Sequence, residues 1–156
     1  MKALDAASTA IVRVLEATAV IVLGVILVIN TLEICARTGF DTSFQWIYEV
    51  NLLLACWLYF LGIVPVYARG GDITLLGYER LMHGRSREIY RAIIEVVTAL
   101  TFAVIAWYAW TLIELQLPFR TPGMRIPNAL FTAPVLIGLI GLTVVSLRRA
   151  LGVLRA

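Results

Sequence analysis

Histidine and cysteine, the side chains that most often hold metals and haem, are nearly absent from this sequence. The 156 residues include one histidine, His83, and two cysteines, Cys35 and Cys56. A haem-binding membrane anchor needs axial ligands within its spans, and a single histidine in a loop cannot supply them. The cysteines lie in or beside apolar runs, where a reduced thiol that packs as a small hydrophobic side chain is favoured over a disulfide.

Charged residues and catalytic motifs are also scarce. Asp, Glu, Lys and Arg make up 15% of the chain, whereas they make up about a quarter of a typical soluble domain. The sequence contains no CxxC, Walker loop, HExxH or GxSxG motif. The low charge therefore excludes a soluble globular domain, and we expect a protein that is not an enzyme and needs no cofactor.

Hydrophobic residues dominate the chain and are concentrated in long runs. They make up 61% of the residues, and the mean hydropathy is +0.91. Each run is close to the ~20 residues of a membrane-spanning helix, and none alternates as a membrane barrel strand would. The sequence predicts an all-α integral membrane protein, a four-helix bundle forming one domain over residues 1–156, with spans at about 14–34, 47–68, 92–113 and 130–147.

The 13 lysines and arginines are distributed unevenly around the four runs. Only three lie in the first and third connections: Arg37, Arg120 and Arg125. The other ten lie before the first run, in or beside the second connection, or after the last run. Because basic residues concentrate on the cytoplasmic side of membrane proteins, we expect both termini and the second connection to be cytoplasmic. Membrane orientation accounts for the positive charge, so no nucleic-acid partner is needed.

One acidic residue inside an apolar run, Glu49, has no basic residue a helical turn away. Arginines three or four residues away account for three other acids: Glu16, Glu33 and Glu95. A lone acid in a membrane span is by default a candidate functional residue. We favour an ion pair between Glu49 and Arg37, across the short first connection, and two alternatives stay open: a contact with another subunit, and a ligand for a transported ion.

Two tryptophans mark different depths of the second run. Trp46 begins the run within an aromatic cluster that suits the headgroup zone. Trp57 follows eleven residues later, about 16 Å deeper and near the middle of the bilayer. We therefore predict that Trp57 contacts a protein group that accepts its N–H. Gly62, three residues before a proline, allows a bend toward the cytoplasmic end of the helix.

Small residues recur at helical spacing in the last two runs. Ala99, Ala103 and Ala106 form a stripe in the third run, and Gly138 with Gly141 does so in the fourth. Small residues let helix backbones approach closely in a membrane. Packing within the chain is favoured, and an interface with a partner subunit is the alternative.

The connection between the third and fourth runs, LPFRTPGMRIPN at 117–128, holds three of the five prolines. Proline removes a backbone donor and interrupts a helix, so this segment cannot be helical throughout. We expect an ordered turn, similar to a lid, at the outer membrane surface.

Several short motifs, in this order and spacing, resemble the small membrane subunit of tripartite ATP-independent periplasmic (TRAP) transporters, the DctQ-like family. They run from about residue 17 to 150 and comprise Arg37, WIYE at 46–49, Trp57, FLG at 60–62, ARGGDI at 68–73 and IPNALFTAPVLIG at 126–138. One residue departs from the family: Asp72 stands where its G-x-H-I pattern has histidine.

The resemblance implies a division of labour among three proteins. In such systems a periplasmic binding protein captures an organic acid, a large multi-span membrane subunit moves it with sodium, and the small subunit is a fixed scaffold in the bacterial inner membrane. Four spans without broken helix pairs would make a poor stand-alone carrier. Two other functions remain as alternatives: an independent homo-oligomeric channel or carrier with Glu49 lining its pathway, and a membrane anchor for an electron-transfer enzyme.

Overall fold

The computed structural model describes residues 2–40, 44, 46–70 and 85–153, and these residues form four long helices. The helices are α1 (Lys2–Phe40), α2 (Trp46–Ala68), α4 (Arg85–Gln116) and α5 (Ala129–Val153). Each contains a segment long and apolar enough to cross a membrane. The predicted all-α architecture with four membrane helices is confirmed, and each predicted span lies inside one helix.

Five threonines within the apolar helices bond to a carbonyl of their own helix. A lone hydroxyl in hydrocarbon needs a partner, and the carbonyl four residues earlier is within reach in a helix. Such bonds, 2.8 to 3.3 Å long, are made by Thr18, Thr31, Thr101, Thr111 and Thr143. These threonines therefore fit a membrane helix without a partner from another helix.

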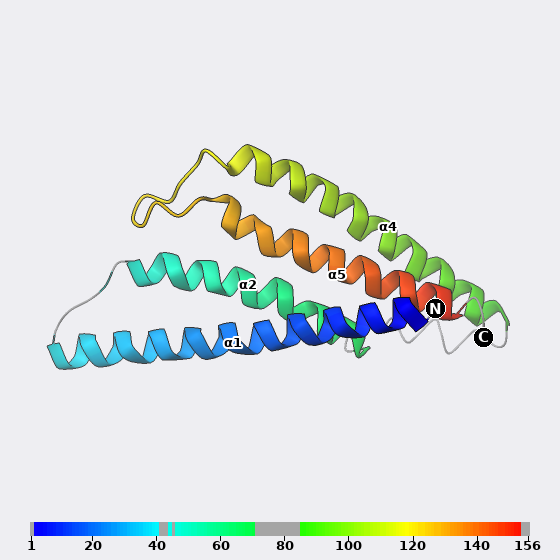
Figure 1. Cartoon of the computed structure of the whole chain (residues 1–156), viewed down its shortest axis with the longest axis horizontal. Helices are drawn as coiled ribbons and strands as arrows, with labels where there is room; N and C mark the ends of the chain where they lie inside the picture. Colours follow the sequence, from blue (N-terminus) through cyan, green and yellow to red (C-terminus); the bar gives the residue numbers. More distant parts are fainter. Residues whose placement is uncertain (1, 41–43, 45, 71–84, 154–156) are drawn as a thin grey trace.

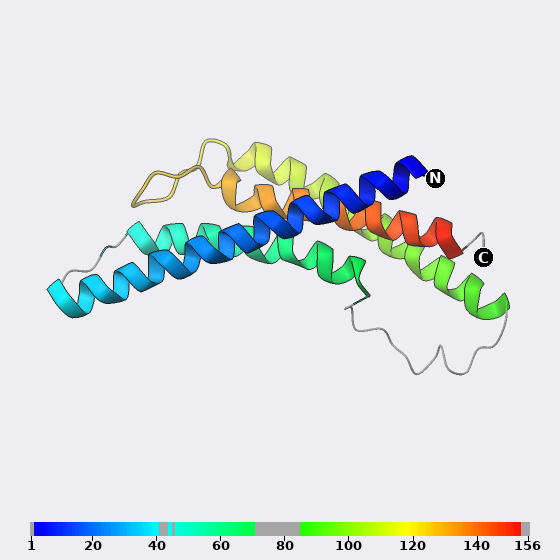
Figure 2. The same ribbon diagram turned by 60° about the horizontal axis from the view of Figure 1, so that its bottom comes forward.

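The four helices of the bundle lie side by side in an open row. Figure 1 shows the order α1, α2, α5, α4 across the molecule. In Figure 2, the N-terminal half of α1 crosses α2 and α5, with which it makes contacts. The N-terminal end of α1 and the C-terminal end of α5 lie at the same end of the long axis of the molecule. A row leaves α1 and α4 each with a broad face that no other helix of the described residues covers.

Alanines form the face of α4 that packs on α5. Ala92, Ala99 and Ala106 are buried at intervals of seven residues, followed by Ala109. Steps of seven return to the same face of a helix, as at a coiled-coil seam. Ala103 falls at the edge of this face and is exposed. The predicted stripe therefore has Ala99 and Ala106 in the seam, and its placement of Ala103 in the packing within this chain is wrong.

Glycines mark the close approach of α5 to α2 and α1. A Cβ atom at Gly138 would lie 2.5 Å from the backbone oxygen of Phe60, and one at Gly141 would lie 3.1 Å from Leu15. At Gly62, by contrast, a Cβ atom would meet nothing within 4 Å. Gly138 is thus required by the packing of this chain, and Gly141 lies in a tight contact with side chains, whereas no contact among the described residues requires Gly62.

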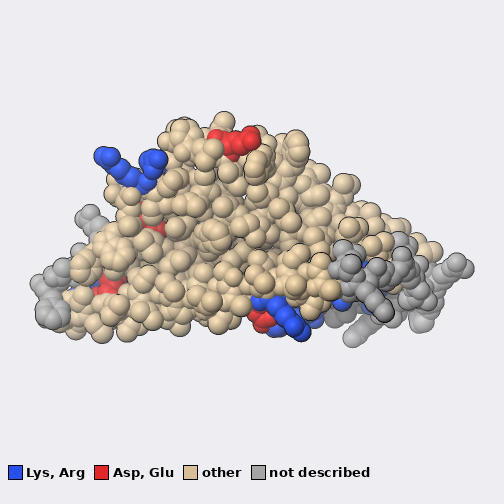
Figure 3. All heavy atoms as spheres, viewed as in Figure 1, with Lys and Arg blue, Asp and Glu red and all other residues tan. Residues whose placement is uncertain are grey.

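Much of the apolar surface remains outside this packing. The accessible surface is 10604 Å², whereas a compact soluble protein of 17.3 kDa would expose about 7,800 Å². Figure 3 shows a broad middle zone without charged atoms, with Lys, Arg, Asp and Glu nearer its margins. Trp107 and Tyr108 on α4 are 73% and 69% exposed. Such a surface requires lipid or another membrane protein as its neighbour.

Candidate functional site

Polar contacts between segments gather at two levels, one near each end of the long axis along which the helices run. Glu49, in the first turn of α2, and Arg69, directly after its last residue, are twenty residues apart. This is about 30 Å along a helix and matches the hydrocarbon thickness of a bilayer. On α4, a similar length separates Glu95 from Gln116, whose side-chain oxygen accepts from the hydroxyl of Thr132 on α5. We call the contacts around Glu49 the hairpin cluster and those around Glu95 the terminal cluster.

A tight hairpin between α4 and α5 forms one side of the hairpin cluster. The N–H of Thr121 donates to the carbonyl of Ile126 at 2.9 Å, and the N–H of Asn128 donates to the carbonyl of Phe119 at 2.9 Å. The Thr121 hydroxyl oxygen also accepts from the N–H of Ile126 at 3.0 Å. Arg125, in the turn, has a left-handed φ of 55°. The connection is therefore an ordered turn, as its prolines predicted.

Glu49, in the first turn of α2, is the acceptor that holds this hairpin. Its carboxylate accepts from the hydroxyl of Thr121 and from the N–H groups of Gly123 and Met124, all at 2.8 Å. A Cβ atom at position 123 would lie 2.6 Å from the Glu49 Oε1 atom, so glycine is needed for this approach. Three donors satisfy the carboxylate, and no cation among the described residues takes part.

The predicted ion pair between Arg37 and Glu49 is therefore wrong. Arg37 instead donates to Glu33, one turn earlier on α1. The helical spacing of four residues holds these two side chains together. The amide groups of the hairpin lie beside the start of α2 and donate to Glu49.

A pair of asparagines joins α1 to α2, two residues after Glu49 on α2. The Nδ2 atom of Asn51 donates to the Oδ1 atom of Asn30 at 2.9 Å, and the return bond from Asn30 to Asn51 is 3.2 Å. Asn30 also donates to the carbonyl of Ile26 at 2.8 Å. Amide pairs of this kind satisfy both partners where water is excluded. Two asparagines within apolar runs were the sequence signal for this contact, which the sequence analysis missed.

Trp57 binds a backbone group that a proline has left free. Its indole N–H donates to the carbonyl of Leu130 at 3.2 Å. In a regular helix that carbonyl would accept from the residue four positions later, but this residue is Pro134, which has no N–H. The indole N–H and the carbonyl that Pro134 leaves without a helical donor thus satisfy each other across the seam between α2 and α5.

The terminal cluster joins α2, α4 and α5 at the opposite end of the long axis from the hairpin. The Glu95 carboxylate accepts from the hydroxyls of Tyr67 at 2.8 Å and Ser146 at 2.7 Å, and from the Nη1 atom of Arg149 at 3.4 Å. Ser146 is fully buried. Arg149 also donates to the carbonyl of Tyr67 and lies 4.4 Å from the centre of its ring. One acid and one base, both largely buried, therefore hold three helices together.

A second ion pair at this end joins α1 to α2. The Nη2 atom of Arg69 lies 2.6 Å from both carboxylate oxygens of Glu16. The local pair predicted between Glu16 and Arg13 is wrong, because the end of α2 lies beside this part of α1. By contrast, the local pair predicted between Glu33 and Arg37 is present.

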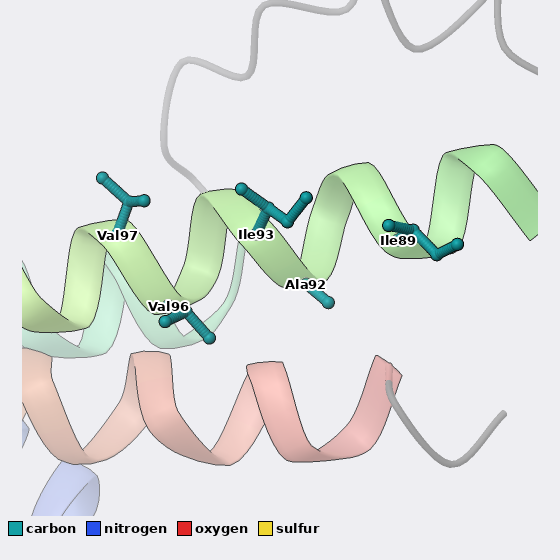
Figure 4. Close-up of a pocket in the computed structure, with 5 residues that line it drawn as sticks. All are labelled: Ile89, Ala92, Ile93, Val96 and Val97. Carbon is teal, nitrogen blue, oxygen red and sulfur yellow. The ribbon is translucent and has the colours of Figure 1, made fainter.

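One apolar groove lies outside these clusters, along α4. It has a volume of about 260 Å³ and is lined by Ile89, Ala92, Ile93, Val96 and Val97. Figure 4 shows these side chains spread along a single helix, without a polar group among them. A solute site normally needs a few convergent polar groups, so this groove offers nothing to orient a charged solute.

A comparison with protein families decides where the chain belongs. The family described as tripartite ATP-independent periplasmic transporters, DctQ component, matches residues 26–156. The chain belongs to the DctQ family. A comparison with curated proteins finds no match. The family match covers α2, α4, α5 and the last part of α1, so it includes both clusters.

Membership in the DctQ family makes this chain a small subunit of a TRAP transporter, and its four apolar helices make it a multi-pass membrane protein. Those of the site residues predicted for this DctQ protein that the structure describes lie apart from one another and form no single site. Glu49 and Trp57 each contact the α4–α5 half of the molecule. Trp46 is 44% exposed, with its ring centre 6.2 Å from that of Phe44. Asp72 lies outside the described residues.

Proposed function

We propose that this DctQ protein is the non-catalytic scaffold of a sodium-coupled TRAP transporter that imports an organic acid across the bacterial inner membrane. In this proposal, a periplasmic binding protein delivers the carboxylate solute, and a large multi-span subunit moves it with sodium. Both chain termini and the second connection lie in the cytoplasm. The row of helices gives the large subunit a fixed framework in the membrane.

The observation that carries this proposal is the environment of Glu49. This acid is the one that the sequence left open as a possible ion ligand. Three hydrogen bonds from the hairpin occupy its carboxylate. A group that binds and releases a moving ion would need free oxygens, whereas a group that fixes a hairpin needs its donors close, as they are here. Glu49 therefore supports a structural function.

The terminal cluster supports the same function. The Glu95 carboxylate accepts from Tyr67, Ser146 and Arg149, one from α2 and two from α5. Buried polar networks of this kind fix one relative position of the packed elements when every member has a partner. Such contacts suit a rigid scaffold better than a carrier whose parts move relative to one another.

Reconstitution tests this proposal against its alternatives. The purified chain alone should be colourless and should transport nothing, and sodium-dependent uptake should appear only when the large subunit and the binding protein are added. Uptake of an organic acid by the pure chain would favour the independent carrier. A preparation that carries haem absorption would favour the electron-transfer anchor.

Cysteine labelling tests the orientation. In a background without Cys35 and Cys56, a cysteine at Pro122 in the hairpin should react in intact cells with a thiol reagent that does not cross membranes. A cysteine at Gly152, near the end of α5, should react only after the cells are opened. Both positions are exposed, so access to the reagent depends on the side of the membrane. The reverse pattern would overturn the proposed topology.

A further inference from the structure

Two arginines project from the hairpin without a carboxylate partner in the described part of the chain. Arg120 donates to the carbonyl of Arg125 at 3.3 Å, which keeps the first side chain beside the second residue. Both residues are exposed. Figure 3 shows basic atoms standing out from the surface where Figure 1 places the hairpin. Glu49, the acid that the hairpin contacts, is held by three hydrogen bonds from Thr121, Gly123 and Met124.

The backbone at Arg125 is in a conformation that arginine rarely adopts. Its φ is 55°, in the left-handed region that glycine and asparagine enter most readily. Strained backbone positions gather at sites where the side chain has a function. An arginine where glycine would fold more easily indicates that its guanidinium is used.

Exposed apolar side chains lie close to the arginines in the sequence. Leu117 and Phe119 are 58% and 59% exposed, and Met124 is 46% exposed. The hairpin joins the ends of two membrane-spanning helices and lies beside the first turn of a third. Cationic and apolar side chains together suit the boundary between headgroups and acyl chains. An acidic protein surface in water would match the arginines but would leave the three apolar side chains wet.

We propose that the hairpin is a binding site for a phospholipid headgroup, with Arg120 and Arg125 on the phosphate and Leu117, Phe119 and Met124 against the upper acyl chains. Guanidinium groups bind phosphate oxygens in pairs of parallel hydrogen bonds, which a lysine cannot reproduce. Two amides and one hydroxyl of the hairpin hold the Glu49 carboxylate, which forms no ion pair with either arginine. This site requires only that the chain spans a membrane and does not depend on the scaffold function.

Native mass spectrometry of the full chain tests the site. The detergent-purified protein is titrated with phosphatidylglycerol, and the apparent Kd of the first bound lipid is measured. Arg120→Gln and Arg125→Gln should each weaken that binding about fivefold, and the double variant about 25-fold. Arg37→Gln is the matched control, because Arg37 is an exposed arginine away from the hairpin that already pairs with Glu33. It should leave the lipid Kd unchanged.

A second variant separates binding from folding. Arg125→Gly relieves the left-handed backbone and removes the guanidinium, so it should raise the Tm of the lipid-free protein while it weakens lipid binding about fivefold. Arg125→Lys keeps the charge and should fall between wild type and Arg125→Gln. If Arg125 served only to hold the hairpin, Arg125→Gly and Arg125→Gln would change lipid binding and Tm in the same direction.

Competing probes identify the source of the phosphate. Diacylglycerol, which lacks a phosphate, should bind equally to wild type and to the double variant. Inorganic phosphate at millimolar concentration should not displace phosphatidylglycerol, because it lacks the acyl contacts. Three results would overturn the proposal: an unchanged lipid Kd in the double variant, displacement by inorganic phosphate, or an arginine-dependent poly-glutamate complex that is tighter than the lipid complex.

Discussion

The hairpin cluster and the terminal cluster are each organised around one glutamate, but the two acids are satisfied in different ways. Glu49 accepts from two backbone N–H groups and one hydroxyl of a single loop. Glu95 accepts from two hydroxyls and an arginine on two other helices, α2 and α5. The first acid therefore fixes the shape and position of a loop, whereas the second fixes three helices relative to one another.

Burial separates the two clusters further. The side chain of Glu95 is 17% exposed and that of Arg149 is 26% exposed, and Ser146 between them is fully buried. Glu49 lies at the end of α2, beside an exposed turn. Removing a buried acid strands its partners, while removing a peripheral acid leaves donors that water can reach. We therefore expect the terminal cluster to control global stability and the hairpin cluster to control local order.

Glu95→Ala should have the largest effect. It leaves Arg149, Ser146 and Tyr67 without their common acceptor, and we expect a loss of about 3 kcal/mol in the free energy of unfolding. Unfolding in mixed micelles of increasing SDS content measures this loss. Glu114→Ala is the matched control, because Glu114 is exposed on the same helix; it should change stability little. Equal losses in the two variants would contradict the importance of the terminal cluster.

Gly138→Ala should come second, because Gly138 lies in the seam between the two clusters. Its new methyl group would meet the backbone oxygen of Phe60, which no side-chain rotation can relieve, and we expect a loss of about 2 kcal/mol. Gly62→Ala, on the open face of α2, should instead gain about 0.5 to 1 kcal/mol. A gain in both variants, in the same unfolding assay, would show that the seam between α2 and α5 is looser than described.

Trp57→Phe should cost about 1 to 2 kcal/mol, because the carbonyl of Leu130 then loses its donor in an apolar setting. Trp107→Phe provides the comparison, since that indole is 73% exposed and should cost under about 0.5 kcal/mol. Thermal unfolding followed by circular dichroism measures both. If Trp107→Phe cost as much as Trp57→Phe, the loss could not be assigned to the bond with Leu130.

Glu49→Ala should have the smallest effect on global unfolding and a clear effect on the hairpin. Without the carboxylate, the amides of Gly123 and Met124 lose their acceptor, and their hydrogen exchange should become faster. Formate or acetate should partly restore protection, because either anion can occupy the vacated position. A protected hairpin in this variant, together with a changed sodium stoichiometry of transport, would assign Glu49 to ion coupling instead.

The sequence predicted the features that depend on local patterns. Four apolar runs predicted four helices, and the spacing of Glu33 and Arg37 predicted their pair. The depth of Trp57 predicted an acceptor for its N–H, and the structure supplies one at Leu130. Pro134 was the signal for which carbonyl this is, because a proline in a helix frees the carbonyl four residues earlier.

The contacts that the sequence missed depend on the order of helices in the row or on backbone groups. Arg69 reaches Glu16 because α2 ends beside this part of α1, and no spacing along the chain reveals this. The donors to Glu49 include the amides of Gly123 and Met124, groups that almost every residue has. Ala103 was misplaced because three alanines within eight residues do not settle which edge of the stripe is buried.

The bond between Trp57 and Leu130 also orders the steps of membrane insertion. The first turns of α5 enter the bilayer with a carbonyl that their own helix cannot satisfy, because Pro134 has no N–H to donate. That carbonyl finds its donor only when α2 lies alongside. During synthesis α2 leaves the ribosome first, so it is already in the membrane when α5 arrives. The pair α1 and α2 thus acts as the template on which α4 and α5 complete their fold.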